Sequence, residues 1–153
     1  DLIINLQGDE PLMDTQDIKN LHNQMIKTSS EIGTLASKIN DKKNYIQENI
    51  VKVITKESLS TSKFPEALDF TRKSNYTNKN TYQHLGIYCY QLEILKKFVS
   101  FNQSQNEIKN RLEQLRALDN NIKINVSLAK SASIGVDTEE DFVAIKKIME
   151  YKS

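Results

Sequence analysis

The chain has 153 residues, among which 21 lysines and arginines nearly balance 20 aspartates and glutamates. This length suits one domain with a single hydrophobic core, and the scattered, near-neutral charge excludes the basic surface that binding to nucleic acid needs. No apolar run in the sequence approaches the roughly 20 residues of a membrane span, and the single cysteine, Cys89, cannot form an internal disulfide, which favours the reducing cytoplasm.

The first half of the chain predicts short strands around one helix. Residues 2–6 form a nearly continuous apolar run, typical of a strand covered on both faces. Asp14 can cap a helix whose apolar residues recur at helical spacing: Ile18, Leu21, Met25 and Ile26. Further β-like runs occupy residues 33–39, 50–54 and 66–71. The chain enters its first strand without an initiator methionine, so we expect an N-terminal part of the domain to precede it.

The second half alternates strands and helices. Residues 84–90 predict the clearest strand, with Leu85, Ile87 and Cys89 on one face and His84, Gly86, Tyr88 and Tyr90 on the other. Two helices at about 91–100 and 107–119, a strand at 122–128 and a last helix after Thr138 complete the order. This order predicts an α/β fold with a mixed, mostly parallel sheet flanked by helices, and ligands at the carboxyl ends of the strands.

Two aspartates are candidate metal ligands. Asp9, in QGDEP, either holds a divalent cation at the end of the first strand or only hydrogen-bonds the turn there. Asp137, in GVDTEEDF, either shares that cation or only favours the positive end of the helix that follows. As a pair they fit Mg²⁺, which takes one or two carboxylates and fills its other positions with water and phosphate oxygens.

Three further residues are candidates for binding a substrate. Arg72 carries a planar guanidinium, the usual partner of a substrate carboxylate. His84 and Tyr88 project from the same face of one predicted strand. Taken singly, Arg72 is equally compatible with a surface position and His84 with a structural role.

The segment RLEQLRALD, residues 111–119, also permits two interpretations. As an ordinary amphipathic helix it would carry Gln114 on its surface, and Glu113 and Arg116 would form a solvated pair at i,i+3 spacing. As part of a site, Glu113 and Gln114 would face a ligand.

Six stretches occur together in one order: QGDEP, VKVI, EALDFTR, HLGIYCY, RLEQLRAL and GVDTEED. In these stretches the chain resembles the 3-deoxy-manno-octulosonate (Kdo) cytidylyltransferases, or CMP-Kdo synthetases. The resemblance implies a nucleotide-diphospho-sugar transferase-like, Rossmann-like fold. Residues 1–153 would be the C-terminal part of a single cytidylyltransferase domain that lacks the N-terminal CTP phosphate loop. The family implies a cytoplasmic homodimer that joins CTP to Kdo for lipopolysaccharide biosynthesis.

The resemblance also assigns roles to individual residues. Asp9 and Asp137 would be the catalytic ligands of Mg²⁺, and Gln7 would line the sugar or nucleotide pocket. Arg72 would receive the sugar carboxylate. Four residues would contact the sugar hydroxyls: His84, Tyr88, Glu113 and Gln114.

The chain also departs from the family pattern. Asp69 stands where the family has tyrosine, and KSNYTNK follows Arg72 in place of a stretch that contains Ile-Pro. Gln91 replaces an arginine, and Asn120 and Asn121 replace a turn glycine, although asparagine tolerates positive φ. Two alternatives therefore stay open: a non-catalytic sugar-acid binding module, and a cytidylyltransferase for a modified (amino) octulosonate.

Overall fold

A computed structural model describes residues 1–6, 14–73 and 79–130 of the chain. Within these ranges six strands form one sheet: β1 (Leu2–Leu6), β2 (Ile32–Ser37), β3 (Lys52–Thr55), β4 (Ala67–Thr71), β5 (Thr81–Gln91) and β6 (Ile124–Leu128). The strand order is β4-β3-β5-β2-β6, and β1 also pairs with β5. Because β1 pairs with residues 87–91 and β3 with residues 81–83, the two share one edge of β5, and β2 occupies the other.

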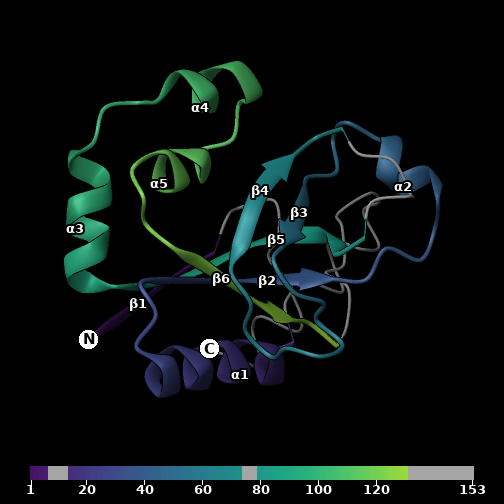
Figure 1. The fold of residues 1–153 in the computed structure, drawn as a ribbon. Coiled ribbons are helices and arrows are strands. Elements are labelled where there is room, and N and C mark those ends of the chain that lie inside the picture. The colour runs from purple at the N-terminus through teal and green to yellow at the C-terminus, as the bar shows by residue number, and fades with distance from the viewer. Residues whose placement is uncertain (7–13, 74–78, 131–153) are drawn as a thin grey trace, which may run out of the picture.

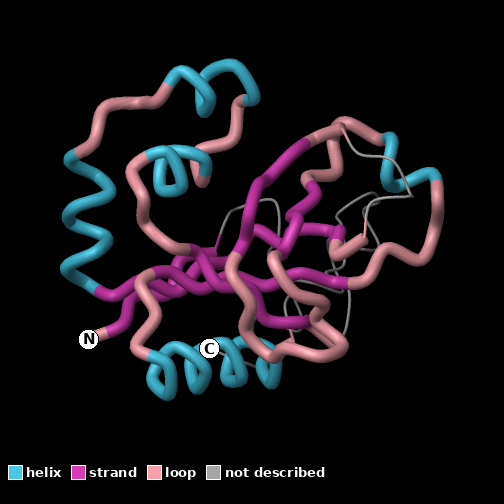
Figure 2. The backbone as a smooth tube through the Cα atoms, viewed as in Figure 1, coloured by secondary structure: helices cyan, strands magenta, loops and turns pink. Residues whose placement is uncertain are grey.

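Five helices accompany the described part of the sheet: α1 (Thr15–Thr28), α2 (Lys43–Ile46), α3 (Leu92–Ser100), α4 (Gln105–Asn110) and α5 (Leu115–Asp119). Figure 1 shows α1 on one side of the sheet and α3, α4 and α5 on the other. Figure 2 shows the strands gathered between these two groups of helices. In the described ranges, no helix has the length and apolar character needed to cross a bilayer.

The predicted mixed sheet is confirmed, but its expected mostly parallel pairing is wrong for the described strands. Only β2 and β6 pair in parallel, and the other four pairings are antiparallel. The expectation that residues 2–6 are covered on both faces is also wrong here, since Ile3 is 37% and Ile4 41% exposed. An apolar run indicates that a strand forms, but it does not show whether the neighbouring strand is parallel or antiparallel, or whether both faces of the strand are buried.

The predicted helix over 107–119 is two short helices, α4 and α5. A capping box starts α4, in which Ser104 and Glu107 each bond the backbone N–H of the other. Arg111 ends it with a left-handed backbone, φ 55°. The helix predicted at 91–100 is confirmed as α3. The predicted last helix after Thr138 lies outside the described residues.

The two faces of β5 belong to two hydrophobic clusters, as the sequence alternation predicts. Leu85, Ile87 and Cys89 pack with α1 residues, which are buried on one side of the sheet. Tyr88 and Tyr90 pack on the other side with residues of α3, α5 and β6. The second side carries the functional candidates.

Helix α1 packs on β2 at Gly33, where the contact leaves no room for a side chain. Asp14 caps the helix as predicted, by accepting a hydrogen bond from the Gln16 N–H at 2.8 Å. A Cβ atom on Gly33 would lie only 2.7 Å from the Met25 sulfur and 2.8 Å from a Leu21 methyl. Both side chains are almost fully buried, so neither can move away freely.

We expect Gly33→Ala to lower the free energy of unfolding by about 1–3 kcal/mol, because one added methyl overpacks this contact. Urea unfolding followed by circular dichroism measures the change. Ile26→Ala on the same helix serves as the control, since Ile26 is 61% exposed and its loss should change stability little. Equal stability of Gly33→Ala and wild type would show that the helix does not rest on β2 as described.

Candidate functional site

A polar pocket of about 340 Å³ lies where β5, the end of β4 and the α4–α5 junction meet. In the described part of the chain its lining is mostly polar or charged, and four of the predicted substrate-binding residues are among the lining residues: Arg72, His84, Glu113 and Gln114. Arg111 and Gly86 also line it. The structure therefore gathers predicted site residues that are up to 42 positions apart in the sequence, from Arg72 to Gln114.

A β-bulge in β5 shapes one wall of this pocket. Thr34 of β2 pairs with Tyr88, but the next residue of β2 pairs with Leu85, so the register slips by two residues. The Thr34 hydroxyl lies inside the bulge, 2.6 Å from the carbonyl oxygen of Ile87. Bulges are common next to ligand sites because they redirect side chains.

The bulge draws His84 and Tyr88 together. The slip of two residues places both on the pocket side of β5, and their ring centroids are 5.4 Å apart. Gly86 lies between them on the same face and has no side chain to keep the rings apart. The two predicted site residues thus form one continuous surface.

His84 is a buried, uncharged imidazole. Its ring packs edge-on against Phe70 at 5.0 Å, and its Nε2 lies 2.8 Å from the Thr34 hydroxyl oxygen. Burial lowers the pKa of His84 to about 3, because the imidazolium would lose its hydration there. The side chain is therefore neutral at physiological pH.

Arg72 ties the loops around the pocket together. Its guanidinium donates hydrogen bonds to the backbone carbonyls of Asn110 (3.2 Å), Arg111 (3.1 Å) and Glu48 (3.1 Å). Lys52, which is fully buried, donates in turn to the carbonyl of Arg72 at 2.6 Å. Burial also lowers the pKa of Lys52.

A buried ion pair fixes the angle between α4 and α5. Arg116 donates to both carboxylate oxygens of Glu107, at 2.9 and 2.6 Å, and stacks over the Phe98 ring at 4.9 Å. The Arg116 bond holds the pKa of Glu107 below its usual value. The interpretation of Glu113 and Arg116 as a simple solvated pair is therefore wrong, since Arg116 is directed toward Glu107 and Glu113 is left at the pocket.

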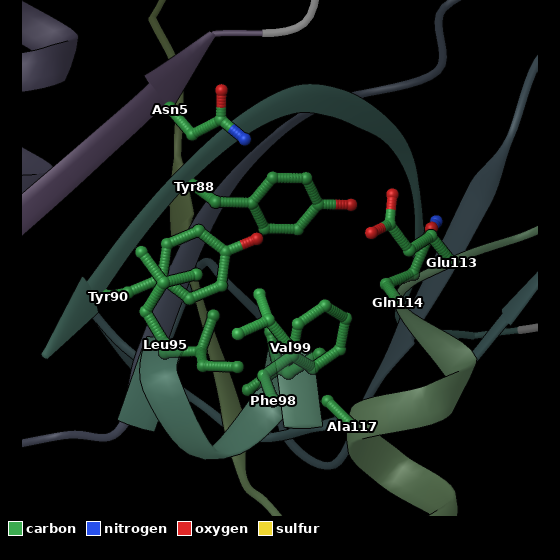
Figure 3. A pocket seen from close by; sticks show the side chains of 11 residues that line it. Asn5, Tyr88, Tyr90, Leu95, Phe98, Val99, Glu113, Gln114 and Ala117 are labelled. Atoms are coloured by element: carbon green, nitrogen blue, oxygen red, sulfur yellow. The ribbon is translucent and has the colours of Figure 1, made fainter. Parts of the chain in front are cut away.

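A second pocket of about 140 Å³, the tyrosine pocket, adjoins the first and shares Glu113 and Gln114 with it. Figure 3 shows the Tyr88 ring directed across this pocket toward Glu113, with Tyr90 beside it. Burial, and next the charge of Glu113, raise the pKa of Tyr90. Asn5 of β1 and Phe98 of α3 also line the tyrosine pocket.

The predicted site residues fall into two groups. The structure brings five of them around the two pockets: Arg72, His84, Tyr88, Glu113 and Gln114. The other three, Gln7, Asp9 and Asp137, lie outside the described residues. That the five bind a substrate stays a prediction.

Sequence reasoning missed Arg111 and Asn5 as lining residues. Arg111 was missed because, in the continuous helix predicted over 107–119, it would have been an ordinary surface residue. Asn5 is the one polar residue of the apolar run 2–6, and this exception was the signal that could have indicated it.

The lining favours a polar, negatively charged small molecule. The polar pocket supplies guanidinium, carboxylate, amide and imidazole groups, which together can bind a carboxylate and several hydroxyls. Within the described ranges, no three His, Cys, Asp or Glu side chains gather as a metal site.

Comparison with known proteins identifies the family. The model of the cytidylyltransferase family matches residues 1–124. The chain belongs to this family. It is 40% identical over 153 residues to a 3-deoxy-manno-octulosonate cytidylyltransferase of Thermodesulfovibrio yellowstonii, in a match that covers 97% of this chain and 60% of the relative. A cytidylyltransferase of the same name from Bartonella tribocorum is 38% identical over 148 residues, which cover 96% of this chain and 60% of the relative.

Solved structures agree with the family. A CMP:2-keto-3-deoxy-manno-octonic acid synthetase, solved in complex with CTP, is similar with a TM-score of 0.78 and 28% identity, over 100% of this chain and 63% of the other. An apo UDP-glucose pyrophosphorylase, at 12% identity, has a TM-score of 0.62 over 99% of this chain and 55% of its own, and shares the fold alone. The chain spans about 60% of the length of these curated relatives.

The buried His84 should make the protein less stable in acid. Its pKa is lower in the folded than in the unfolded state, so the unfolded chain binds the extra proton and stability falls as pH drops from about 6.5 toward 3. At pH 4.5 the loss should be about 2–3 kcal/mol. Urea unfolding at pH 7 and 4.5 measures it.

In that experiment His84→Gln should lose less stability than wild type between the two pH values. His22→Gln removes the chain's other histidine, which lies in α1. This variant should lose as much stability as wild type between the two pH values. If the His84 variant and wild type lose stability equally, the ring is not buried in the neutral form.

Proposed function

We propose that the protein is a 3-deoxy-manno-octulosonate cytidylyltransferase, which activates Kdo with CTP for lipopolysaccharide biosynthesis. The polar pocket carries this proposal, because Arg72, His84, Glu113 and Gln114 line one cavity of about 340 Å³. A polyhydroxylated acid matches that lining: its carboxylate can pair with a guanidinium and its hydroxyls with the other polar groups. Family membership and relatives of this name support the same reaction.

In the proposed reaction the anomeric 2-hydroxyl oxygen of Kdo attacks the α-phosphorus of CTP. A new oxygen–phosphorus bond forms, the bond to the β-phosphate bridge breaks, and pyrophosphate leaves while the hydroxyl proton is released. Such an in-line transfer depends on positioning and on neutralising phosphate charge, without a covalent enzyme intermediate. The described residues would position the sugar.

Two arginines would bind the sugar carboxylate. The Arg72 guanidinium has five N–H groups, of which three bond backbone carbonyls, so two are left for a ligand. Arg111 lines the same pocket and is exposed, and within the described ranges its side chain makes no hydrogen bond or ion pair. The polar pocket therefore offers cationic groups to an acid.

Mg²⁺ is the proposed cofactor, and Asp9 and Asp137 would hold it together with phosphate oxygens of CTP. This donor set of two carboxylates and phosphate oxygens is the kind that Mg²⁺ prefers, and the ion would neutralise charge on the phosphates. Position along the chain supports this proposal, because Asn5, near the end of β1, lines the tyrosine pocket, and Gln7 and Asp9 follow β1 directly in the sequence.

A cytoplasmic homodimer is the proposed form of the protein, as the family resemblance implies. The buried, free thiol of Cys89 supports a reducing compartment.

The full-length protein should release pyrophosphate when CTP, Mg²⁺ and Kdo are all present. Coupled detection of pyrophosphate with a panel of acid sugars, including an amino analogue of Kdo, measures activity and specificity. Asp137→Asn, which keeps the side-chain shape but removes the charge, should lose most of the activity. Binding of Kdo without pyrophosphate release would indicate a binding module, and preference for the amino analogue would indicate the modified substrate.

Arg72 and Arg111 should differ in their effect on stability. Removal of either guanidinium should reduce kcat/KM for the sugar about 10- to 100-fold, since a charge-assisted hydrogen bond contributes about 1.5–3 kcal/mol. Only Arg72→Ala should also lower the free energy of unfolding, because it releases three carbonyls. Arg111→Gly should not, because glycine accepts the left-handed backbone at that position.

Steady-state kinetics and urea unfolding of the two variants test this difference. Lys109→Ala removes an exposed positive charge from α4, the helix that Arg111 ends, and is the matched control. Unchanged sugar kinetics in Arg111→Gly would remove Arg111 from the site, and unchanged stability in Arg72→Ala would contradict its role in tying the loops.

A further inference from the structure

The hydrogen bonds around Thr34 determine which nitrogen of His84 carries the proton. The Thr34 hydroxyl has one hydrogen to donate. Its oxygen lies 2.6 Å from the Ile87 carbonyl oxygen and 3.4 Å from that of Leu85, and both of these atoms can only accept. The hydroxyl hydrogen therefore goes to Ile87. Toward His84 Nε2, at 2.8 Å, the same oxygen can only accept.

His84 Nε2 must therefore donate, so it carries the hydrogen of the neutral ring. A neutral imidazole has one N–H, which leaves Nδ1 with a lone pair and no hydrogen. In the described part of the chain Nδ1 makes no hydrogen bond. His84 is 7% exposed and lines the polar pocket.

We propose that Thr34 is a positioning residue that holds His84 as the Nε2–H tautomer, so that Nδ1 accepts a hydrogen bond from a hydroxyl of the substrate in the polar pocket. The low pKa of His84 agrees with this, because protonation would place a hydrogen on Nδ1 and remove the acceptor. The bulge holds both partners in place, since Thr34 is fully buried between β5 and β6.

The tautomer determines the orientation in which a ligand can bind in the pocket. An acceptor at Nδ1 favours a hydroxyl and disfavours a carboxylate or phosphate, which would bring a second lone pair toward it. Arg72 and Arg111, on the same pocket, have the opposite preference. A sugar acid would thus bind with its carboxylate at the arginines and a hydroxyl at His84. This ligand assignment rests on the proposed function, whereas the tautomer does not.

Nitrogen-15 NMR of the histidine-labelled, full-length protein tests the tautomer directly. At neutral pH the two ring nitrogens of His84 should show separate shifts, protonated for Nε2 and unprotonated for Nδ1. His22, the other histidine, provides the comparison in the same spectrum. A protonated Nδ1, or averaged shifts that indicate exchange between tautomers, would overturn the proposal whether or not the protein has cytidylyltransferase activity.

Two substitutions test the role of Thr34. Thr34→Val keeps the shape but removes the hydroxyl, and it should produce averaged His84 shifts and raise the KM for the sugar about tenfold while leaving the KM for CTP unchanged. Thr34→Ser restores the hydroxyl and should restore both the Nε2–H signal and the KM.

A purely structural role for Thr34 would give a different result. Loss of stability in Thr34→Val with wild-type His84 shifts and sugar KM would overturn the proposal. If Thr34→Val does not fold, wild type and Thr34→Ser still decide the question, since both must show Nε2–H. If both show that tautomer but Kdo does not bind, the proposed function fails and the tautomer assignment stands.

Discussion

The bulge in β5, filled by one hydroxyl group, is the constraint on which the site depends. A regular strand would satisfy the carbonyls of Leu85 and Ile87 in the ladder, but the two-residue slip opposite β2 directs both toward Thr34. The slip also brings His84 and Tyr88 to within 5.4 Å of each other.

The opposite wall is built from charged side chains whose partners are mostly backbone carbonyls; Lys52 is fully buried and Arg72 is half-buried. Lys52 and Arg72 bring two cations to the junction of β3, β4 and the α4–α5 segment, and each is hydrogen-bonded to carbonyl oxygens. Burial of a charge is tolerated only with such bonds. Arg116 and Glu107 join α5, whose N-cap is Gln114, to α4. The pocket is thus polar both at its surface and in the layer that carries it.

The sequence was informative where local pattern decides the structure. Alternation in residues 84–90 indicated the two faces of β5 correctly, and Asn121 adopts the positive φ, 62°, that its residue type permits. The break between α4 and α5 could not be predicted, since a continuous helix would use the carbonyls of Asn110 and Arg111 internally. Arg72, 38 residues away from Asn110, binds those carbonyls instead, and such a long-range competitor has no local signal. The strand directions were missed for the same reason.

The position of Cys89 has a consequence for how opening of the fold can be observed. The thiol is fully buried in β5, the strand with three partners, and burial raises its pKa to about 11. Reaction with a thiol reagent needs an exposed thiolate, so it requires the packing of α1 against this face of β5 to open. As the chain has a single cysteine, the rate of that reaction reports one event, the uncovering of β5, and distinguishes it from fraying at the edges of the sheet.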